Sequence, residues 1–184
     1  MQRSEAIKRA YEIPGQTWPR ELGALYDLCK GSTCHVEIGS FCGRSLFTSA
    51  MSLAHSAKLF AVDPLIEIDT KYPMPSEAWW ENVLSITLQT IRDYRPDLQV
   101  RWFRCGSLEA AREIDVIPDT VFIDGDHNYA EVSADIQAWS HAKKLFGHDY
   151  WPQHAGVMRA VNELCEEFVI VPNTRIWQAV TVQK

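Results

Sequence analysis

The chain has 184 residues, 46% of them hydrophobic and 23% charged, which is enough apolar material for the core of one globular domain spanning 1–184. Its net charge of −6 argues against nucleic acid or an anionic membrane as the main partner, and no stretch approaches the roughly 18 apolar residues of a membrane span. The first residues lack the apolar core of a secretory signal, and the five cysteines form no Cys-x-x-Cys pair, so we expect reduced thiols in a cytoplasmic protein.

Helical and strand-like patterns alternate along the chain. Residues 1–18 are an amphipathic start that ends in a turn signal, and apolar residues then recur at helical spacing over 19–29. The later helices are predicted at 44–55, from Trp79 to Ile91, and at 108–114, 130–144 and 155–167. The strands are predicted at the run ending in Ile38 and at 58–64, 98–105, 119–124, 145–150, 168–172 and 176–182. This order predicts an α/β, Rossmann-like, doubly wound and mostly parallel seven-stranded sheet, with an antiparallel C-terminal edge strand and helices on both faces.

The chain is organised around residues 34–45, where a short apolar run meets two glycines and then a helical pattern. The run ends near Glu37, and Gly39 and Gly43 follow before the helix begins at about Arg44. Glycines let the backbone turn sharply and approach a ligand closely, and the free N–H groups of a helix's first turn face outward. The stretch therefore has the form of a nucleotide-binding turn, although two glycines also occur in turns that bind nothing.

Polar residues stand at the end of nearly every predicted strand, where ligands bind in sheets of this kind. They are Glu37, Asp63, Ser107, the group from Asp124 to His127, and the group from His148 to Tyr150. Asp63 lies where an acid can accept hydrogen bonds from a ribose diol, although Pro64 after it also suits a turn aspartate. Ser107 can equally cap the helix at 108–114. A purely structural sheet has no need of so many acids at this edge, so the pattern favours a ligand site.

The segment Asp124-Gly-Asp-His-Asn-Tyr129 is the chemical centre of the sequence. Its aspartates could hold a divalent cation together with Asp149 from the next strand. Alternatively, His127 or His148 could act as a general base near neutral pH. A plain turn is the third interpretation, since Asp, Gly and Asn all favour turns.

These motifs resemble the class I S-adenosylmethionine-dependent methyltransferases, and among them the small-molecule branch that includes macrocin and catechol O-methyltransferases. The resemblance covers about 12–182 and rests on five segments in a fixed order: 36–45, 61–64, 122–129, 147–150 and 156–161. The Gly-x-x-x-Gly spacing, with Phe41 between the glycines, differs from the Gly-x-Gly-x-x-Gly of dinucleotide sites. A cofactor without phosphates suits that spacing better.

The resemblance implies S-adenosyl-L-methionine as the cofactor and a role for each matching residue. Glu37 and Gly39 would hold its methionine end, Asp63 its ribose hydroxyls, and Ser107 would lie near the adenine. Asp124 would lie beside the transferred methyl group. The remaining predicted cofactor contacts are in the turn and the helix start: Ser40, Phe41, Gly43 and Ser45.

The same resemblance implies methyl transfer to a hydroxyl of a small molecule, with Asp124, His127 and His148 as the catalytic residues. It allows Mg2+ as a second cofactor on Asp124 and Asp149. Two departures concern that metal: Tyr150 is a poor ligand, and the turn before Leu145 is shorter than in the family, which is expected to shift Asp149.

The acceptor is expected to be a natural product, a sugar or a phenol, bound by the N-terminal segment 1–18 and by loops at 65–80 and 150–155. Tyr72, Trp79 and Trp80 could close over it or simply pack a helix. Two rival functions stay open: a non-catalytic module that binds the cofactor, and an NAD-type oxidoreductase. A homodimer is one expected assembly state of the protein.

Overall fold

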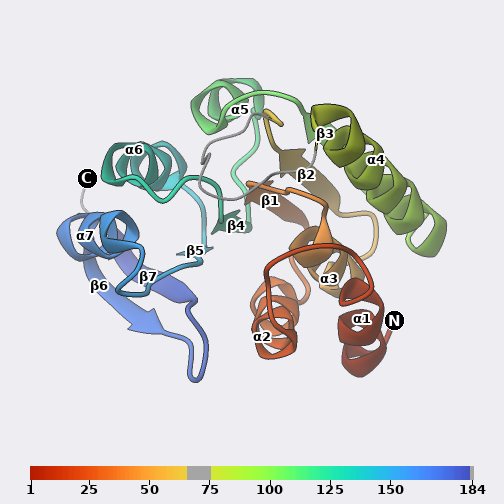
Figure 1. Cartoon of the computed structure of the whole chain (residues 1–184), viewed down its shortest axis with the longest axis horizontal. Helices are drawn as coiled ribbons and strands as arrows, with labels where there is room; N and C mark the ends of the chain where they lie inside the picture. Colours follow the sequence, from red (N-terminus) through yellow and green to blue (C-terminus); the bar gives the residue numbers. More distant parts are fainter. Residues whose placement is uncertain (66–75, 183–184) are drawn as a thin grey trace.

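A computed structural model describes residues 1–65 and 76–182, and its centre is a seven-stranded sheet with the order β3-β2-β1-β4-β5-β7-β6 (Figure 1). The strands are β1 (Cys34–Ile38), β2 (Lys58–Val62), β3 (Gln99–Phe103), β4 (Thr120–Ile123), β5 (Leu145–Gly147), β6 (Cys165–Ile170) and β7 (Trp177–Val182). The first five strands pair in parallel, whereas β7 is antiparallel to both β5 and β6. The predicted sheet, including its antiparallel C-terminal edge, is confirmed.

Seven helices cover the two faces of the sheet in the described part of the chain (Figure 1). Helices α1 (Arg3–Ala10), α2 (Pro19–Cys29), α3 (Arg44–Ser52) and α4 (Glu77–Tyr94) pack around one hydrophobic cluster. Helices α5 (Ser107–Glu113), α6 (Tyr129–Trp139) and α7 (Ala155–Leu164) pack around the other. Among the described helices, none combines the length and the apolar character needed to cross a bilayer.

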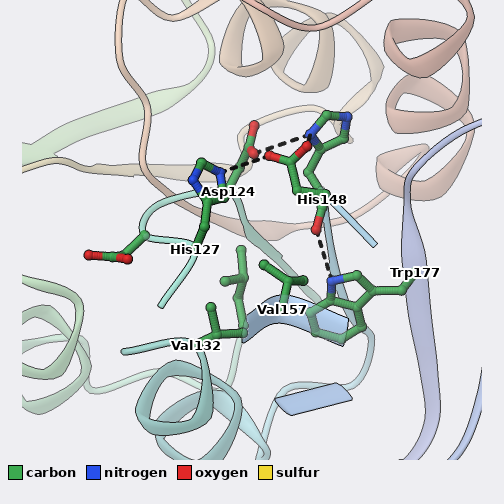
Figure 2. Close-up of a pocket in the computed structure, with 9 residues that line it drawn as sticks. Asp124, His127, Val132, His148, Val157 and Trp177 are labelled. Carbon is green, nitrogen blue, oxygen red and sulfur yellow. Dashed lines mark hydrogen bonds and ion pairs between the residues drawn. The ribbon is translucent and has the colours of Figure 1, made fainter. Parts of the chain in front are cut away.

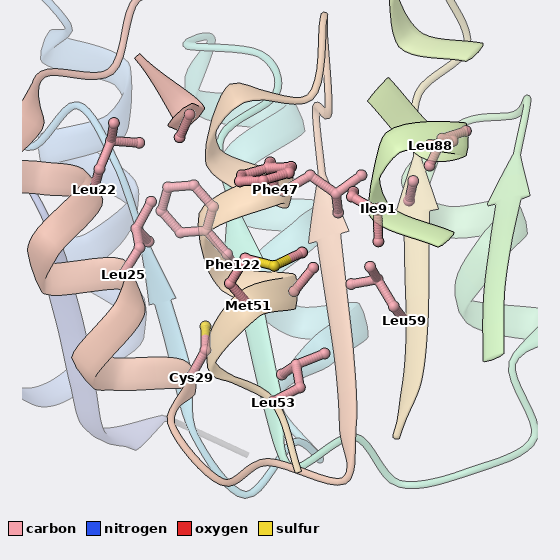
Figure 3. Close-up of a cluster of buried hydrophobic side chains, with 14 of the residues drawn as sticks. Leu22, Leu25, Cys29, Phe47, Met51, Leu53, Leu59, Leu88, Ile91 and Phe122 are labelled. Atoms are coloured by element: carbon pink, nitrogen blue, oxygen red, sulfur yellow. The ribbon is translucent and has the colours of Figure 1, made fainter. Parts of the chain in front are cut away.

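The first cluster joins the N-terminal helices to the sheet (Figure 3). Leu22 and Leu25 of α2 lie near Phe122 of β4, while Met51 of α3 lies between them and the strands (Figure 3). All four side chains are buried. The predicted amphipathic helix at 19–29 is therefore held against the sheet by its apolar face, which also brings the polar residues of α2 toward the strand ends.

Several elements end earlier or begin earlier than their sequence pattern predicts. The helix predicted over 130–144 stops at Trp139, because Lys143 N and Lys144 O already form backbone hydrogen bonds with Pro118 O and Val121 N. The helix predicted over 155–167 stops at Leu164, because Cys165 pairs with Val182 as the first residue of β6. In both places strand pairing with a distant segment ends a helix whose local pattern would continue.

Candidate active site

The glycine turn between β1 and α3 contains three residues with left-handed backbone conformations: Gly39 (φ 81°), Phe41 (φ 46°) and Gly43 (φ 86°). A Cβ atom at Gly39 would collide with the backbone oxygen of Asp124, and one at Gly43 would press on Thr87 of α4. Both glycines are therefore required by close approach as well as by φ. The turn brings the end of β1 against the end of β4, which places the predicted cofactor loop beside Asp124.

Glu37 lies beneath this turn and is fully buried. Ser45 Oγ donates a hydrogen bond to Glu37 Oε1 at 2.9 Å, while Oε2 has no hydrogen-bond partner among the described residues. Burial raises the pKa of Glu37 well above its usual range, and the bond from Ser45 opposes this only in part. Glu37 thus ties the start of α3 to β1 and keeps one free carboxyl oxygen in the interior.

Asp63, at the end of β2, is already bonded to two backbone groups. Phe41 N donates to its Oδ2 at 2.7 Å and Leu65 N to its Oδ1 at 2.8 Å. Burial raises its pKa, and these two bonds counteract the rise. Asp63 therefore forms the turn that its sequence context suggested and also holds the strained Phe41 in place, while its contact with a ribose stays a prediction.

Ser107, the first residue of α5, uses its hydroxyl within the protein. Trp139 Nε1 donates to Ser107 Oγ at 2.8 Å, and the hydroxyl also hydrogen-bonds to Asp135 of α6. The side chain thus joins α5 to α6, and its predicted place near an adenine stays untested. Asp135 is itself buried, which raises its pKa to about 6.

We expect Asp135→Asn to stabilise the protein increasingly as the pH rises. The folded-state pKa of about 6 exceeds the unfolded value of 3.8. The ionisation of buried Asp135 therefore does not lower the free energy of unfolding below about pH 4, and it lowers that free energy by its full amount above about pH 6. That difference corresponds to up to about 3 kcal/mol, which the asparagine variant avoids. Urea unfolding at pH 4, 5, 6 and 7 measures the effect, with the exposed Glu166→Gln as control; a stability difference that does not vary with pH would contradict it.

The chemical centre is a cluster at the ends of β4 and β5, made by Asp124, His127, His148 and Asp149 (Figure 2). The register of the sheet pairs Ile123 with Gly147, so Asp124 and His148 follow at the same level. The short turn before β5 does not remove Asp149 from the site, since its Oδ2 lies 2.8 Å from His127 Nε2. Asp149 therefore lies within the cluster despite the short turn.

His148 is enclosed by carboxylates from three elements. Its Nε2 lies 3.2 Å from Glu21 Oε1, and its Nδ1 lies 3.5 Å from Asp124 Oδ1 and 3.3 Å from Asp149 Oδ1. Burial alone would lower the pKa of His148, but the charges of Asp124, Asp149 and Glu21 outweigh it and raise that pKa to about 12. A ring that stays protonated has no lone pair with which to accept a proton, so the geometry does not suit His148 as a general base.

His127 has the surroundings that a base requires. Its side chain is 46% exposed and forms the 2.8 Å hydrogen bond with Asp149. That bond raises the pKa of His127 above its usual value. The ring also lies against the ring of His154, tilted by 40° with 4.1 Å between the centroids. When Nε2–H is donated to Asp149, Nδ1 is left to accept a proton, which is the histidine–aspartate arrangement of many general bases.

The predicted Mg2+ site on Asp124 and Asp149 can be tested on the same geometry. Mg2+ requires oxygen ligands in near-octahedral geometry at about 2.1 Å. His148 Nδ1 lies within 3.5 Å of one oxygen of each aspartate, so Asp124, His148 and Asp149 together offer three ligand atoms that are close enough to hold one ion. A histidine nitrogen is not the oxygen ligand that Mg2+ prefers, and the Mg2+ site stays a prediction.

Three residues of the site were not singled out from the sequence: Glu21, His154 and Arg175. An acid beside Leu22 and Leu25 on the apolar face of α2 was the one available signal for Glu21. His154 precedes α7, which lies so close that a Cβ at Gly156 would collide with the His127 backbone. Arg175 Nη1 lies 3.9 Å from Asp149 Oδ1.

Other predicted features have structural roles or fall outside the described residues. Cys42 is buried, which raises its pKa to about 11 and keeps it as an unreactive thiol. Trp80 is buried against Phe41, edge to face at 5.0 Å, whereas Trp79 is partly exposed. Most of the loop 65–80, including Tyr72, lies outside the described residues. In the N-terminal segment, Ala6 and Ala10 of α1 are buried in the first hydrophobic cluster.

Comparison with known families gives one match, to a methyltransferase domain, over residues 36–150. This range begins in β1 and ends one residue after Asp149, so it includes the glycine turn and the whole β4–β5 cluster. No curated protein matches the sequence.

Solved structures with the same fold include several O-methyltransferases. One from Bacillus cereus, in complex with SAH, has 15% identity and a TM-score of 0.62, with 98% of this chain and 90% of that chain covered. TomG from Streptomyces achromogenes, involved in tomaymycin synthesis and solved with SAM, has 14% identity and a TM-score of 0.62 over 97% and 89%. A SAM-dependent O-methyltransferase from Thermotoga maritima has 12% identity and a TM-score of 0.64 over 100% and 72%.

Proposed function

The chain belongs to the methyltransferase domain family, with the sheet order typical of class I S-adenosylmethionine-dependent members, and from this premise we propose that it methylates a hydroxyl group of a small molecule. The observation that carries the proposal is the hydrogen bond of 2.8 Å between His127 and Asp149, beside the end of β4. It provides a proton acceptor of the kind that an alcohol or phenol needs. Similar structures named as O-methyltransferases support the same choice.

In this proposal the glycine turn would hold the cofactor. Gly39, Ser40, Phe41 and Gly43 present backbone toward its methionine end, and Glu37 with Ser45 holds the turn from below. Asp63 accepts from the ribose hydroxyls with lone pairs that its two backbone bonds leave free. Asp124 would lie beside the sulfonium, because its backbone abuts Gly39.

Methyl transfer is an in-line displacement at carbon. When bound, S-adenosylmethionine would supply the methyl group: the acceptor oxygen would bond to the methyl carbon as the carbon–sulfur bond breaks, and the electron pair would leave on the sulfur of S-adenosylhomocysteine. The acceptor's hydroxyl proton passes to His127 Nδ1, while Asp149 holds Nε2–H and stabilises the imidazolium that forms. Because no covalent step falls to the protein, positioning the two reactants supplies much of the rate.

Calorimetric titration with three ligands tests the cofactor assignment. We expect S-adenosylmethionine and S-adenosylhomocysteine to bind with micromolar or tighter dissociation constants, and NAD to show no saturable binding. The physical reason is the Gly-x-x-x-Gly turn, in which Phe41 stands where a dinucleotide pyrophosphate would need a glycine. Tight NAD binding without the other two would overturn the proposal.

The rival of a non-catalytic module is tested with an acceptor screen. The folded protein is incubated with S-adenosylmethionine and a library of phenols, sugars and hydroxylated natural products, and methylated products are detected by mass spectrometry. Turnover that is lost in Asp124→Ala, with the fold retained by circular dichroism, supports an enzyme. Cofactor binding without any turnover across the library would favour the module.

A further inference from the structure

We propose that His35, joined to Glu37 through a buried water molecule, is a positioning residue for the glycine turn. His35 lies two residues before Glu37 on β1, and both side chains are fully buried. The inference rests on the proposed function for the ligand of that turn, which is S-adenosylmethionine. His35 acts on cofactor binding only through Glu37.

Three fully buried polar atoms behind the turn have no hydrogen-bond partner within residues 1–65 and 76–182. They are His35 Nε2, Glu37 Oε2 and Ser49 Oγ. The first two face each other, with 4.0 Å between His35 Nε2 and Glu37 Oε2. Polar atoms left unpaired in the interior lose the hydrogen bonds that they make with water in the unfolded chain. A native structure therefore provides them with a shared partner.

The third atom, Ser49 Oγ, belongs to the same interface between β1 and α3. His35 and Glu37 point to the same face of the sheet, because they are two residues apart on a strand. Ser45, which donates to Glu37 Oε1, and Ser49 share one side of α3, because they are four residues apart on a helix. Helix α3 connects two parallel strands and so runs back along β1, which places Ser49 at the level of His35.

A single water molecule satisfies this set of atoms. A separation of 4.0 Å is too long for a direct hydrogen bond, but a water about 2.8 Å from each atom bridges it. Buried waters make about three hydrogen bonds to protein groups, and three unpartnered atoms lie here. The geometry therefore favours one water bound by His35, Glu37 and Ser49.

The donors and acceptors along this line are complementary. His35 Nδ1 lies 2.9 Å from Thr120 Oγ1, and when Nδ1–H is donated there, Nε2 keeps a lone pair for the water. Burial raises the pKa of Glu37, and because Oε1 accepts from Ser45, the carboxyl proton is carried by Oε2. Oε2–H then donates to the water, and the water donates to Nε2.

This polar line joins β4 to the first turn of α3. It runs from Thr120 through His35 and Glu37 to Ser45. One oxygen of the Glu37 carboxyl group is held by the helix and the other by the water, so the group cannot rotate without breaking a hydrogen bond. His35 thereby fixes the direction from which Glu37 holds α3, and with it Gly43, which leads into that helix.

Two amide substitutions separate the two ends of the His35 ring. The amide of glutamine reaches the position of Nε2, whereas that of asparagine reaches only the position of Nδ1, so His35→Gln keeps a partner for the water and His35→Asn does not. We expect His35→Asn to weaken S-adenosylmethionine binding about 5- to 20-fold and His35→Gln to stay within about threefold of the wild type. Equilibrium dialysis on the full chain measures the affinities, and circular dichroism monitors the fold. An equal loss in both variants would overturn the inference.

A double-mutant cycle tests whether His35 acts through Glu37. In the Glu37→Ala protein the water has no carboxyl group to hold, so adding His35→Asn should weaken binding by no more than about a further twofold. A general loosening of the core would instead lower the affinity by the same factor in both backgrounds, and that result would contradict the proposal.

Ser49→Ala tests the same water without changing His35, should the His35 variants not fold. Its matched control is Ser52→Ala, which deletes a hydroxyl from the same buried helix, where Ser52 Oγ donates to Ser49 O. Ser49→Ala should weaken S-adenosylmethionine binding about 3- to 10-fold, and the control should stay within about twofold. Equal affinities in these two variants would refute the shared water.

Hydrogen exchange of the turn separates a failure of this inference from a failure of the proposed function. A wild type that binds neither S-adenosylmethionine nor S-adenosylhomocysteine would refute the cofactor assignment, but the amides of residues 39–47 would still report how firmly the turn is held. His35→Asn should speed their exchange by about fivefold or more, whereas His35→Gln should exchange nearly as the wild type does. Equal exchange in all three proteins would remove the positioning role from His35.

Discussion

Replacing His127 by alanine is expected to lower the rate of methyl transfer about 100- to 10 000-fold, the usual range for loss of a general base. The physical reason is that its bond to Asp149 prepares Nδ1 for a proton, and His148 beside it is enclosed by three carboxylates and cannot take over. The affinity for S-adenosylmethionine should stay within about twofold, because His127 is not among the residues predicted to bind the cofactor. Initial rates on an acceptor found in the library screen measure the effect.

The control for this prediction is His154→Ala. The His154 ring lies against that of His127, with 4.1 Å between centroids, but its Nε2 is 3.7 Å from Asp149 Oδ1, beyond hydrogen-bond distance. Its loss should cost far less than the loss of His127, and added imidazole should restore part of the rate of His127→Ala but not that of Asp124→Ala. A His127→Ala protein with nearly unchanged turnover would show that another group removes the proton.

Glu37→Ala is expected to weaken S-adenosylmethionine binding about 10- to 100-fold, or about 1.4 to 2.7 kcal/mol, while the protein stays folded. Glu37 supports the glycine turn from below through its bond to Ser45, so its loss frees the start of α3 to move. Because the free carboxyl oxygen is buried without a partner among the described residues, removing the side chain also removes an unfavourable burial. Calorimetry gives the affinity and circular dichroism gives the fold.

Glu37→Gln separates shape from charge in this prediction. Burial keeps the pKa of Glu37 high, and the amide has the size and the acceptor oxygen of a protonated carboxyl group. The glutamine variant should therefore retain most of the cofactor affinity. An equal loss of cofactor affinity in both variants would mean that an ionised carboxylate contacts the cofactor. Unchanged affinity in Glu37→Ala would show that Glu37 takes no part in cofactor binding.

The strand, glycine turn and helix over residues 34–52 could be predicted from the sequence because their causes are local. Left-handed backbone at Gly39 and Gly43 and the helical recurrence of apolar residues in α3 depend on neighbours a few residues away. The alternation of strands and helices likewise predicted the mostly parallel sheet. The polar strand ends predicted a site at the carboxyl edge of that sheet, since parallel strands present their carboxyl ends together.

The chemistry within the cluster depends on contacts that no local pattern contains. Glu21 and His148 are 127 positions apart in sequence and meet because α2 packs against the sheet beside β4 and β5. Whether a histidine is a base or a buried cation follows from how many carboxylates surround it and how much water is left, and both depend on packing between distant segments. The sequence thus predicted the turn and the strand edge, whereas only the tertiary structure distinguishes His127, which is half exposed and bonded to Asp149, from His148, which is buried among three carboxylates.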